Sequence, residues 1–223
     1  MKEIKFKTKY RAVFFDLDGT LFDTSAGIYD TFDRVFKEYG REVDRSLYPS
    51  FIGPPVRSSL ERFFESGTAA EAHGIFRAFY SSPEMKFNAK LYDGIEDVLK
   101  YCKDIGMRVY TATSKSEIMS VEIIEKFGIS AYFDRIYGAD ANAGRVEKAD
   151  VLSYALAGSK EKLCECLLVG DTVFDVSGAK AAGIDCLAVL YGFGKKEEMT
   201  GAHVAGYAES TGDIIKFFEK GMN

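Results

Sequence analysis

The stretch RAVFFDLDGTLFDTS, residues 11–25, decides the fold, because an apolar run leads directly into two aspartates. Residues 11–15 have the length and the continuous apolar character of a buried strand. Asp16 and Asp18 stand one residue apart where that run ends, so an extended chain points both side chains to the same side. In open α/β sheets, ligands bind outside the carboxyl ends of the strands. The stretch therefore predicts a first strand that presents two carboxylates at a binding edge.

The rest of the chain alternates strand and helix patterns. Near-continuous apolar runs at 107–112, 133–137, 164–169 and 184–190 are typical of parallel strands covered on both faces. Between and after them lie helical patterns at 93–106, 116–127, 147–157, 174–182 and 211–220. Asp93 followed by Glu96 predicts a capping box at the start of the first of these helices. This alternation predicts a doubly wound, parallel α/β sheet.

Residues 24–82 break the alternation, because they contain no good strand. An apolar stripe there predicts a helix that ends at Gly40, and it comprises Ile28, Phe32, Val35, Phe36 and Tyr39. Further helical patterns lie around 56–66 and 69–81, the second of them ended by Pro83. The chain therefore carries a helical insertion directly behind the aspartate pair, placed as a lid over the first strand.

Composition excludes several classes of protein. The chain has 223 residues, of which 47% are apolar and 28% charged, an ordinary balance for a globular protein. The net charge of −5 provides no basic field for nucleic acid or for a membrane surface. No apolar run approaches the ~18 residues of a membrane-spanning helix. The four cysteines, Cys102, Cys164, Cys166 and Cys186, lack metal-ligand spacing and are expected to be reduced, as in a cytoplasmic protein.

Polar residues follow several of the predicted strands. Thr113, Ser114 and Lys115 follow the run at 107–112, and Asp171 and Asp175 follow the run at 164–169. Each residue alone has a simpler explanation: aspartates and hydroxyls commonly cap helices or turns. Lys148, in the first turn of the helix at 147–157, is by itself most simply a solvated lysine.

Convergence of these groups at one edge is harder to explain in that way. Close carboxylate pairs repel by on the order of 4 kcal/mol at an effective dielectric constant of 20. A divalent cation with oxygen ligands, such as Mg²⁺, offsets that repulsion. A lysine and paired hydroxyls beside it would bind an anion such as phosphate. These are the components of phosphoryl transfer.

The sequence resembles the haloacid dehalogenase-like superfamily of hydrolases. The resemblance rests on four motifs in order: DLDGT at 16–20, Thr113 at the end of an apolar strand, Lys148 opening a helix, and GDTVFD at 170–175. It is most similar to the phosphoglycolate phosphatase-like branch with a helical cap. It implies a Rossmann-like α/β core of residues 1–22 and 88–223 and an all-α cap of residues 23–87.

The resemblance also implies roles for the strand-end residues. Asp16 would be the nucleophile that forms an aspartyl phosphate, and Asp18 the general acid and base. Thr20 would orient Asp18, and the Gly19 N–H would face the phosphate. Thr113 and the Ser114 N–H would bind phosphate oxygens, and Lys148 would supply positive charge.

The implied metal is Mg²⁺. Its ligands would be Asp16, the main-chain carbonyl of Asp18, and Asp171. Asp175 would hold either a metal-bound water or Lys148. The implied reaction is hydrolysis of a small phosphorylated metabolite, with phosphoglycolate, a nucleoside monophosphate and pyrophosphate as candidates.

Other activities of the superfamily remain alternatives. An aspartate at position 18 favours phosphoryl chemistry over dehalogenation. Neither Lys37 nor Lys86 has the context of a Schiff-base lysine. A phosphomutase similar to β-phosphoglucomutase, a nucleotidase, a pyrophosphatase and a non-catalytic phospholigand-binding protein stay open, as does the oligomeric state.

The helical insertion contains the segment FIGPPVRSS, residues 51–59. Gly53, Pro54 and Pro55 predict a stiff turn before a helix. This turn is either a plain connector with a solvated Arg57 or a loop that faces the active site. In the second case Arg57 would bind the distal part of the substrate. Hinges for lid motion are expected near 22–24 and 85–92.

Overall fold

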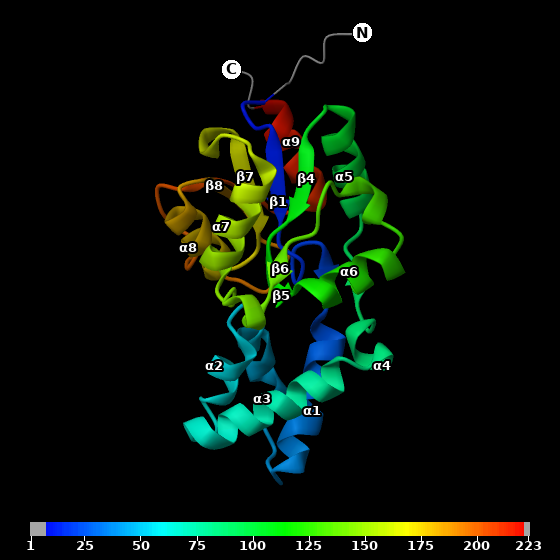
Figure 1. Cartoon of the computed structure of the whole chain (residues 1–223), viewed down its shortest axis with the longest axis vertical. Helices are drawn as coiled ribbons and strands as arrows, with labels where there is room; N and C mark the ends of the chain where they lie inside the picture. The colour runs from blue at the N-terminus through cyan, green and yellow to red at the C-terminus, as the bar shows by residue number, and fades with distance from the viewer. Residues whose placement is uncertain (1–7, 221–223) are drawn as a thin grey trace.

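The computed structural model describes residues 8–220 and contains a central parallel sheet (Figure 1). The strand order is β4-β1-β7-β8-β9, and every neighbouring pair is parallel. The strands are β1 (Ala12–Phe15), β4 (Arg108–Thr111), β7 (Cys166–Gly170), β8 (Asp185–Val189) and β9 (Val204–Ala208). The predicted doubly wound α/β fold is confirmed.

Helices cover both faces of this sheet (Figure 1). One face packs against α5 (Ile95–Asp104), α6 (Glu117–Lys126) and α9 (Thr211–Lys220). The other packs against α7 (Lys148–Ser159) and α8 (Val173–Ala182). In β1, Val13 and Phe15 enter the first core, and Ala12 and Phe14 enter the second. Two covered faces explain why the strand sequences are continuously apolar.

The helical insertion lies at the far end of the long axis from most of the sheet (Figure 1). Its elements are α1 (Ser25–Glu38), η1 (Arg45–Phe51), α2 (Val56–Leu60), α3 (Ser66–Tyr80) and α4 (Pro83–Lys86). We call this the cap. The cap has a hydrophobic core of its own, rich in aromatic rings. The chain enters and leaves it through β2 (Phe22–Asp23) and β3 (Lys90–Leu91), which pair antiparallel.

The aromatic core of the cap makes one stability prediction. Phe32 is fully buried and its ring lies 4.8 Å from Phe76 and 4.9 Å from Phe51, centroid to centroid. Phe32→Ala is expected to lower the free energy of unfolding by about 3–5 kcal/mol, measured by denaturant unfolding. Ile118→Ala is the control, because Ile118 is 76% exposed, and its effect should stay within about 0.5 kcal/mol. Equal losses for the two variants would contradict the assignment of this core.

Several predicted elements differ from those observed. No strand forms over 133–137, where Arg135 makes only an isolated bridge to Tyr110. The Asp134 carboxylate there accepts the Val109 N–H, at 2.8 Å, and so takes the place of a main-chain partner. β9 was not predicted. It is an edge strand in which Ala205 and Tyr207 are exposed, and Gly206 interrupts its apolar run.

Two predicted helix boundaries also change. The Asp93–Glu96 capping box does not form: α5 is preceded by Gly94, at φ 84°, with no side-chain cap. The predicted helix at 56–66 ends at Leu60, and Pro83 begins α4. The predicted helix that ends at Gly40 is confirmed as α1.

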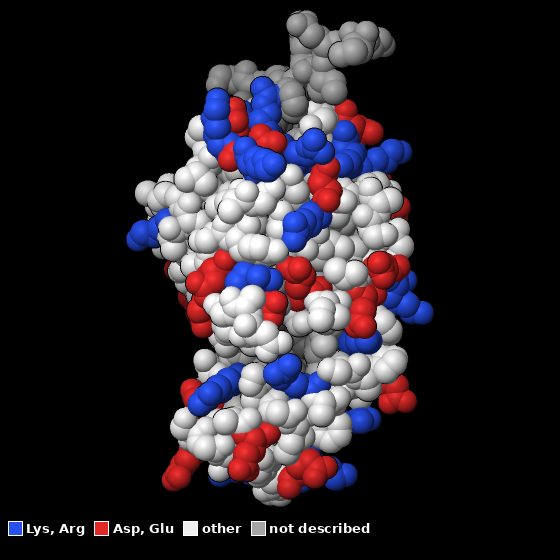
Figure 2. All heavy atoms as spheres, viewed as in Figure 1, with Lys and Arg blue, Asp and Glu red and all other residues white. Residues whose placement is uncertain are grey.

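The remaining short elements lie at the edges of the core. They are β5 (Thr113–Ser116), which pairs with β6 (Gly138–Ala139), and the short helices η2 (Ser130–Tyr132), η3 (Ala141–Ala143) and η4 (Leu163–Glu165). Within residues 8–220, no helix combines the length and apolar character needed to cross a membrane. Acidic and basic side chains are mixed on the face in Figure 2, which is hollowed where the cap meets the core.

Candidate active site

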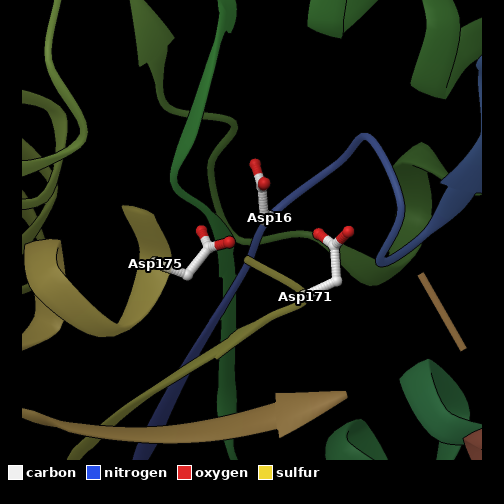
Figure 3. A group of neighbouring side chains, drawn as sticks. All are labelled: Asp16, Asp171 and Asp175. Carbon is white, nitrogen blue, oxygen red and sulfur yellow. The ribbon is translucent and has the colours of Figure 1, made fainter. Parts of the chain in front are cut away.

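Three buried carboxylates meet at the carboxyl ends of β1 and β7 (Figure 3). Asp16 follows β1, Asp171 follows β7, and Asp175 lies in the first turn of α8. Each offers one oxygen within 4.8 Å of the others. The predicted convergence of these three residues therefore occurs at the edge of the sheet where ligands bind in α/β folds.

Lys148 supplies positive charge to this group. Its Nζ lies 2.7 Å from Asp16 Oδ1 and 2.8 Å from Asp175 Oδ1, and it donates a hydrogen bond to the Ala112 carbonyl at 3.0 Å. The Lys148 side chain is 5% exposed, so it is not a solvated surface lysine. Lys148 is the first residue of α7, which carries it under the ends of the central strands.

Local structure fixes Asp175. Its carboxylate accepts hydrogen bonds from the Thr172 N–H, at 3.0 Å, and from the Thr172 hydroxyl, at 2.8 Å, which caps the start of α8. Two glycines make room for the group: a Cβ at Gly170 would lie 2.3 Å from Asp175 Cγ, and one at Gly178 would lie 2.6 Å from Lys148 Cγ. The other oxygen of Asp175 thereby faces Lys148.

Among the described residues, Asp171 forms no ion pair with Lys148, and it is held instead by two neutral donors. The Thr20 hydroxyl donates to its Oδ1 at 3.1 Å, and the Phe193 N–H donates to its Oδ2 at 2.8 Å. The expectation that Thr20 orients Asp18 is therefore wrong, since this hydroxyl is bound to Asp171. Burial, together with Asp175 and Asp16, raises the pKa of Asp171 well above its usual value.

The same burial raises the pKa of Asp16 to about 6, although Lys148 acts in the opposite direction. Three buried carboxylates thus lie near one ammonium group that contacts only two of them. The residues fit a hard divalent cation, because all are oxygen donors and their combined charge is incompletely balanced.

Asp18 lies beside this group but has a different partner. Its Oδ2 is 3.2 Å from Nζ of Lys115, which belongs to β5. Lys115 also donates to the Tyr80 hydroxyl of the cap, at 2.9 Å. The sequence predicted where Lys115 would lie, at the end of a strand, but not its contact with Asp18. The feature of the sequence that could have indicated this contact is the position of Lys115 two residues after Thr113.

The other predicted phosphate-binding groups lie nearby. Thr113 is buried, and its Oγ1 accepts the Lys115 N–H at 3.2 Å. Ser114 lines a cavity together with Lys148. The Gly19 N–H donates to the Phe22 carbonyl at 2.8 Å, so the expectation that this amide faces a phosphate is not met. Gly19 itself, at φ 81°, still turns the chain sharply after Asp18.

The cap loop reaches the same place. A cavity of about 160 Å³ is lined from the core by Ser114 and Lys148 and from the cap by Gly53 and Pro55. A Cβ at Gly53 would lie 2.9 Å from Thr172 Cγ2, so the loop touches the core directly. The Gly53–Pro55 turn therefore lies beside Ser114 and Lys148, although none of the three carboxylates lines this cavity.

Arg57 does not line that cavity. Its Nε donates to Glu61 Oε1 at 3.1 Å, and its Nη2 donates to Ser66 Oγ at 3.3 Å, both within the cap. Its side chain is half exposed. The predicted role of Arg57 in binding substrate has no contact in this structure that supports it.

Comparison with known proteins identifies the family. Residues 13–189 match the family model described as haloacid dehalogenase-like hydrolase. The chain belongs to the haloacid dehalogenase-like hydrolase family, as the four motifs predicted.

Relatives carry several names. The chain is similar to the tyrosine-protein kinase PtkA of Mycobacterium tuberculosis, at 37% identity over 186 residues, or 83% of this chain and 64% of PtkA. It therefore spans less than two thirds of that protein's length. It is 31% identical to a 5'-nucleotidase of Pseudomonas aeruginosa over 86% of this chain and 87% of that protein. A phosphoglycolate phosphatase of Aquifex aeolicus is 30% identical over 83% and 87% respectively.

Solved structures share the whole architecture. A haloacid dehalogenase-like family hydrolase from Streptococcus pneumoniae superposes with a TM-score of 0.89 at 31% identity. The similarity covers 94% of this chain and 99% of that one. The predicted arrangement of an α/β core with helices inserted after the first strand is therefore an architecture shared with this relative.

Proposed function

We propose that the protein is a Mg²⁺-dependent phosphomonoester hydrolase that works through an aspartyl phosphate. The observation that carries the proposal is the buried contact of Lys148 with both Asp16 and Asp175, in a group of three carboxylates at the strand ends. Buried like charges held together without a structural need for them are typical of functional sites.

Asp16 is the nucleophile in this proposal. A carboxylate oxygen attacks phosphorus, a new P–O bond forms, and the bond from phosphorus to the leaving oxygen breaks. Its place at the end of a central strand, 6% exposed, holds the attacking oxygen in a fixed position. Lys148 keeps Asp16 ionised and offsets the negative charge of the phosphoryl group.

Asp18 moves the proton. It donates to the leaving oxygen, then accepts a proton from the water that attacks the aspartyl phosphate and returns Asp16 to its starting form. The two aspartates differ in their surroundings: Asp16 contacts Lys148, and Asp18 contacts Lys115. That difference supports a division of roles between nucleophile and acid–base. Thr113 and Ser114 are the proposed donors to the phosphate oxygens.

Mg²⁺ is the proposed cofactor, held by Asp16, Asp171 and the main-chain carbonyl of Asp18, with Asp175 behind them. When bound, the cation supplies charge that neutralises the phosphoryl oxygens. The raised pKa of Asp171, caused first by burial, supports this assignment, because a cation beside that carboxylate would stabilise its ionised form.

Metal binding predicts a thermal shift. Millimolar Mg²⁺ is expected to raise the melting temperature above its value in EDTA. At a hundredfold excess of Mg²⁺ over the dissociation constant, binding should add about 3 kcal/mol to the free energy of unfolding. The shift should be larger at neutral than at acidic pH, because the ligands must lose their protons. Asp171→Asn should abolish it, whereas Asp104→Asn, at an exposed carboxylate, should not. A shift of equal size in both variants would contradict the metal site.

We propose a small phosphorylated metabolite as substrate. The cavity of about 160 Å³ beside Lys148 has room for a compact group beneath the Gly53–Pro55 turn, and Phe174 lines both this cavity and a second one of about 440 Å³. Relatives named 5'-nucleotidase and phosphoglycolate phosphatase support phosphomonoesters as the class. Phosphoglycolate, nucleoside monophosphates and pyrophosphate are the first compounds to test.

The test is release of inorganic phosphate from a panel of phosphorylated metabolites, with Mg²⁺ and with EDTA. Release that EDTA abolishes supports the proposal. Exchange between phosphate isomers without release would indicate a phosphomutase, and neither result with intact Mg²⁺ binding would indicate a binding protein. ATP with a tyrosine acceptor belongs in the panel, because one relative is named a tyrosine-protein kinase.

Two further parts of the proposal concern organisation. We propose that residues 1–22 with 88–223 form the catalytic domain, and that residues 23–87 form a cap that closes over it by hinging at 22–24 and 85–92. The β2–β3 pair joins the two parts at those positions.

The free cysteines, three of them buried, support a reducing compartment such as the cytoplasm.

A further inference from the structure

Lys115 joins the catalytic core to the cap through a single ammonium group. Its Nζ lies 3.2 Å from Asp18 Oδ2 and donates to the Tyr80 hydroxyl at 2.9 Å. The same atom lies 4.4 Å from the centroid of the Tyr80 ring. Lys115 belongs to β5 of the core, and Tyr80 is the last residue of α3 in the cap.

Lys115 and Tyr80 are almost entirely removed from water, and Asp18 is largely so. The Lys115 side chain is 6% exposed, the Asp18 side chain 18%, and Tyr80 5%. A buried ammonium group is stable only with partners that replace its hydration. Lys115 has one partner from the core and one from the cap, so its position depends on both.

The contact also gives the two oxygens of Asp18 different surroundings. Asp18 Oδ1 is buried and has no hydrogen-bond partner among the residues that the structure describes, whereas Oδ2 faces Lys115. Thr20, the other candidate to orient Asp18, donates to Asp171. Lys115 therefore holds the Asp18 carboxylate through Oδ2 and leaves Oδ1 buried and without a partner in the part of the chain that the structure describes.

We propose that Lys115 is a positioning residue that couples the orientation of Asp18 to the docked position of the cap through Tyr80. The inference rests on the phosphatase function proposed above. Proton transfer by Asp18 is then efficient only while the cap is closed and Tyr80 holds Lys115. This arrangement links acid–base catalysis to the exclusion of bulk water.

The test compares two leaving groups in Lys115→Met. An alkoxide needs a proton as it leaves, but the nitrophenolate of p-nitrophenyl phosphate does not, and kcat/KM reports only the steps up to departure of the leaving group. General acid catalysis contributes about 10²–10⁴-fold, so we expect a loss of about 10–100-fold for an alkyl phosphate and less than about 3-fold for p-nitrophenyl phosphate.

Two further variants keep the test informative if Lys115→Met folds poorly. Tyr80→Phe removes only the hydroxyl, and it should give a smaller loss with the same preference for alkyl phosphates. Adding Tyr80→Phe to Lys115→Met should cause no further loss, because both act through one contact. Lys86→Met is the control: Lys86 also joins cap to core, 2.7 Å from Glu122, but away from Asp18. It should lower both reactions equally or not at all.

The inference is overturned by equal losses for the two substrates, by additive effects of the two substitutions, or by the same selectivity in Lys86→Met. These outcomes all require an active wild-type protein. Absence of any phosphate release from the wild type would instead reject the proposed function, so the two failures are distinguishable.

Discussion

Asp16→Asn is expected to abolish phosphate release, with kcat lower by on the order of 10⁵-fold or more, because it removes the proposed nucleophile. The amide is nearly isosteric, but it cannot form the aspartyl phosphate. Steady-state release and labelling of the protein with radioactive phosphate are the two measurements. Both should fall to background with every substrate of the panel that the wild type hydrolyses.

Asp104→Asn is the matched control for that experiment. Asp104 is an exposed carboxylate at the end of α5, so its replacement removes the same charge far from the site. This variant should keep wild-type rates. Thermal unfolding should show that both variants are folded. An Asp16→Asn protein that keeps more than a few per cent of activity contradicts the nucleophile assignment.

Lys148→Met is expected to lower both stability and activity. Lys148 contacts two buried carboxylates, at 2.7 and 2.8 Å, and its removal leaves them without a counter-charge. Breaking a buried ion pair in this way costs about 3–5 kcal/mol of unfolding free energy. Denaturant unfolding in EDTA measures the loss, and kcat should fall by about 10²–10³-fold as the phosphate loses a cation.

The loss of stability in Lys148→Met should depend on pH. Burial already raises the pKa of Asp16 to about 6, and Lys148 opposes that rise, so the variant should raise it further. A carboxyl group whose pKa is higher in the folded than in the unfolded state destabilises the fold above its unfolded pKa, and this cost disappears on acidification. The difference from wild type should therefore be larger near about pH 8 than near about pH 5.

A surface lysine provides the comparison for Lys148. Lys216 pairs with Asp213 at 2.8 Å, but both lie on the exposed side of α9. Lys216→Met should change stability little at either pH, because exposed pairs are well screened. A Lys148→Met protein with a loss as small as that of Lys216→Met, or with a loss that grows on acidification, would contradict the buried network.

Much of the fold follows from local sequence patterns. The run at 11–15 reads as a strand covered on both faces because Val13 and Phe15 enter one core and Ala12 and Phe14 the other. The edge strand β9 was not predicted, because it lacks a second covered face. The strand predicted at 133–137 does not form, because the Asp134 side chain accepts a hydrogen bond that a main-chain carbonyl would otherwise accept.

For the candidate site too, some features follow from the sequence and others from the tertiary structure. The local sequence pattern predicts that Asp16, Thr113 and Asp171 follow strands and that Lys148 opens a helix. Because parallel strands end at one edge of a sheet, it also predicts that these residues come together. The contacts between side chains become visible only in the folded chain: Thr20 binds Asp171 rather than Asp18, and Lys115 binds both Asp18 and Tyr80. Pairings of this kind depend on distances between segments far apart in the chain. The order of the strands determines which residues lie at the same edge of the sheet. The packing of the helices and of the cap determines which of their atoms are in contact.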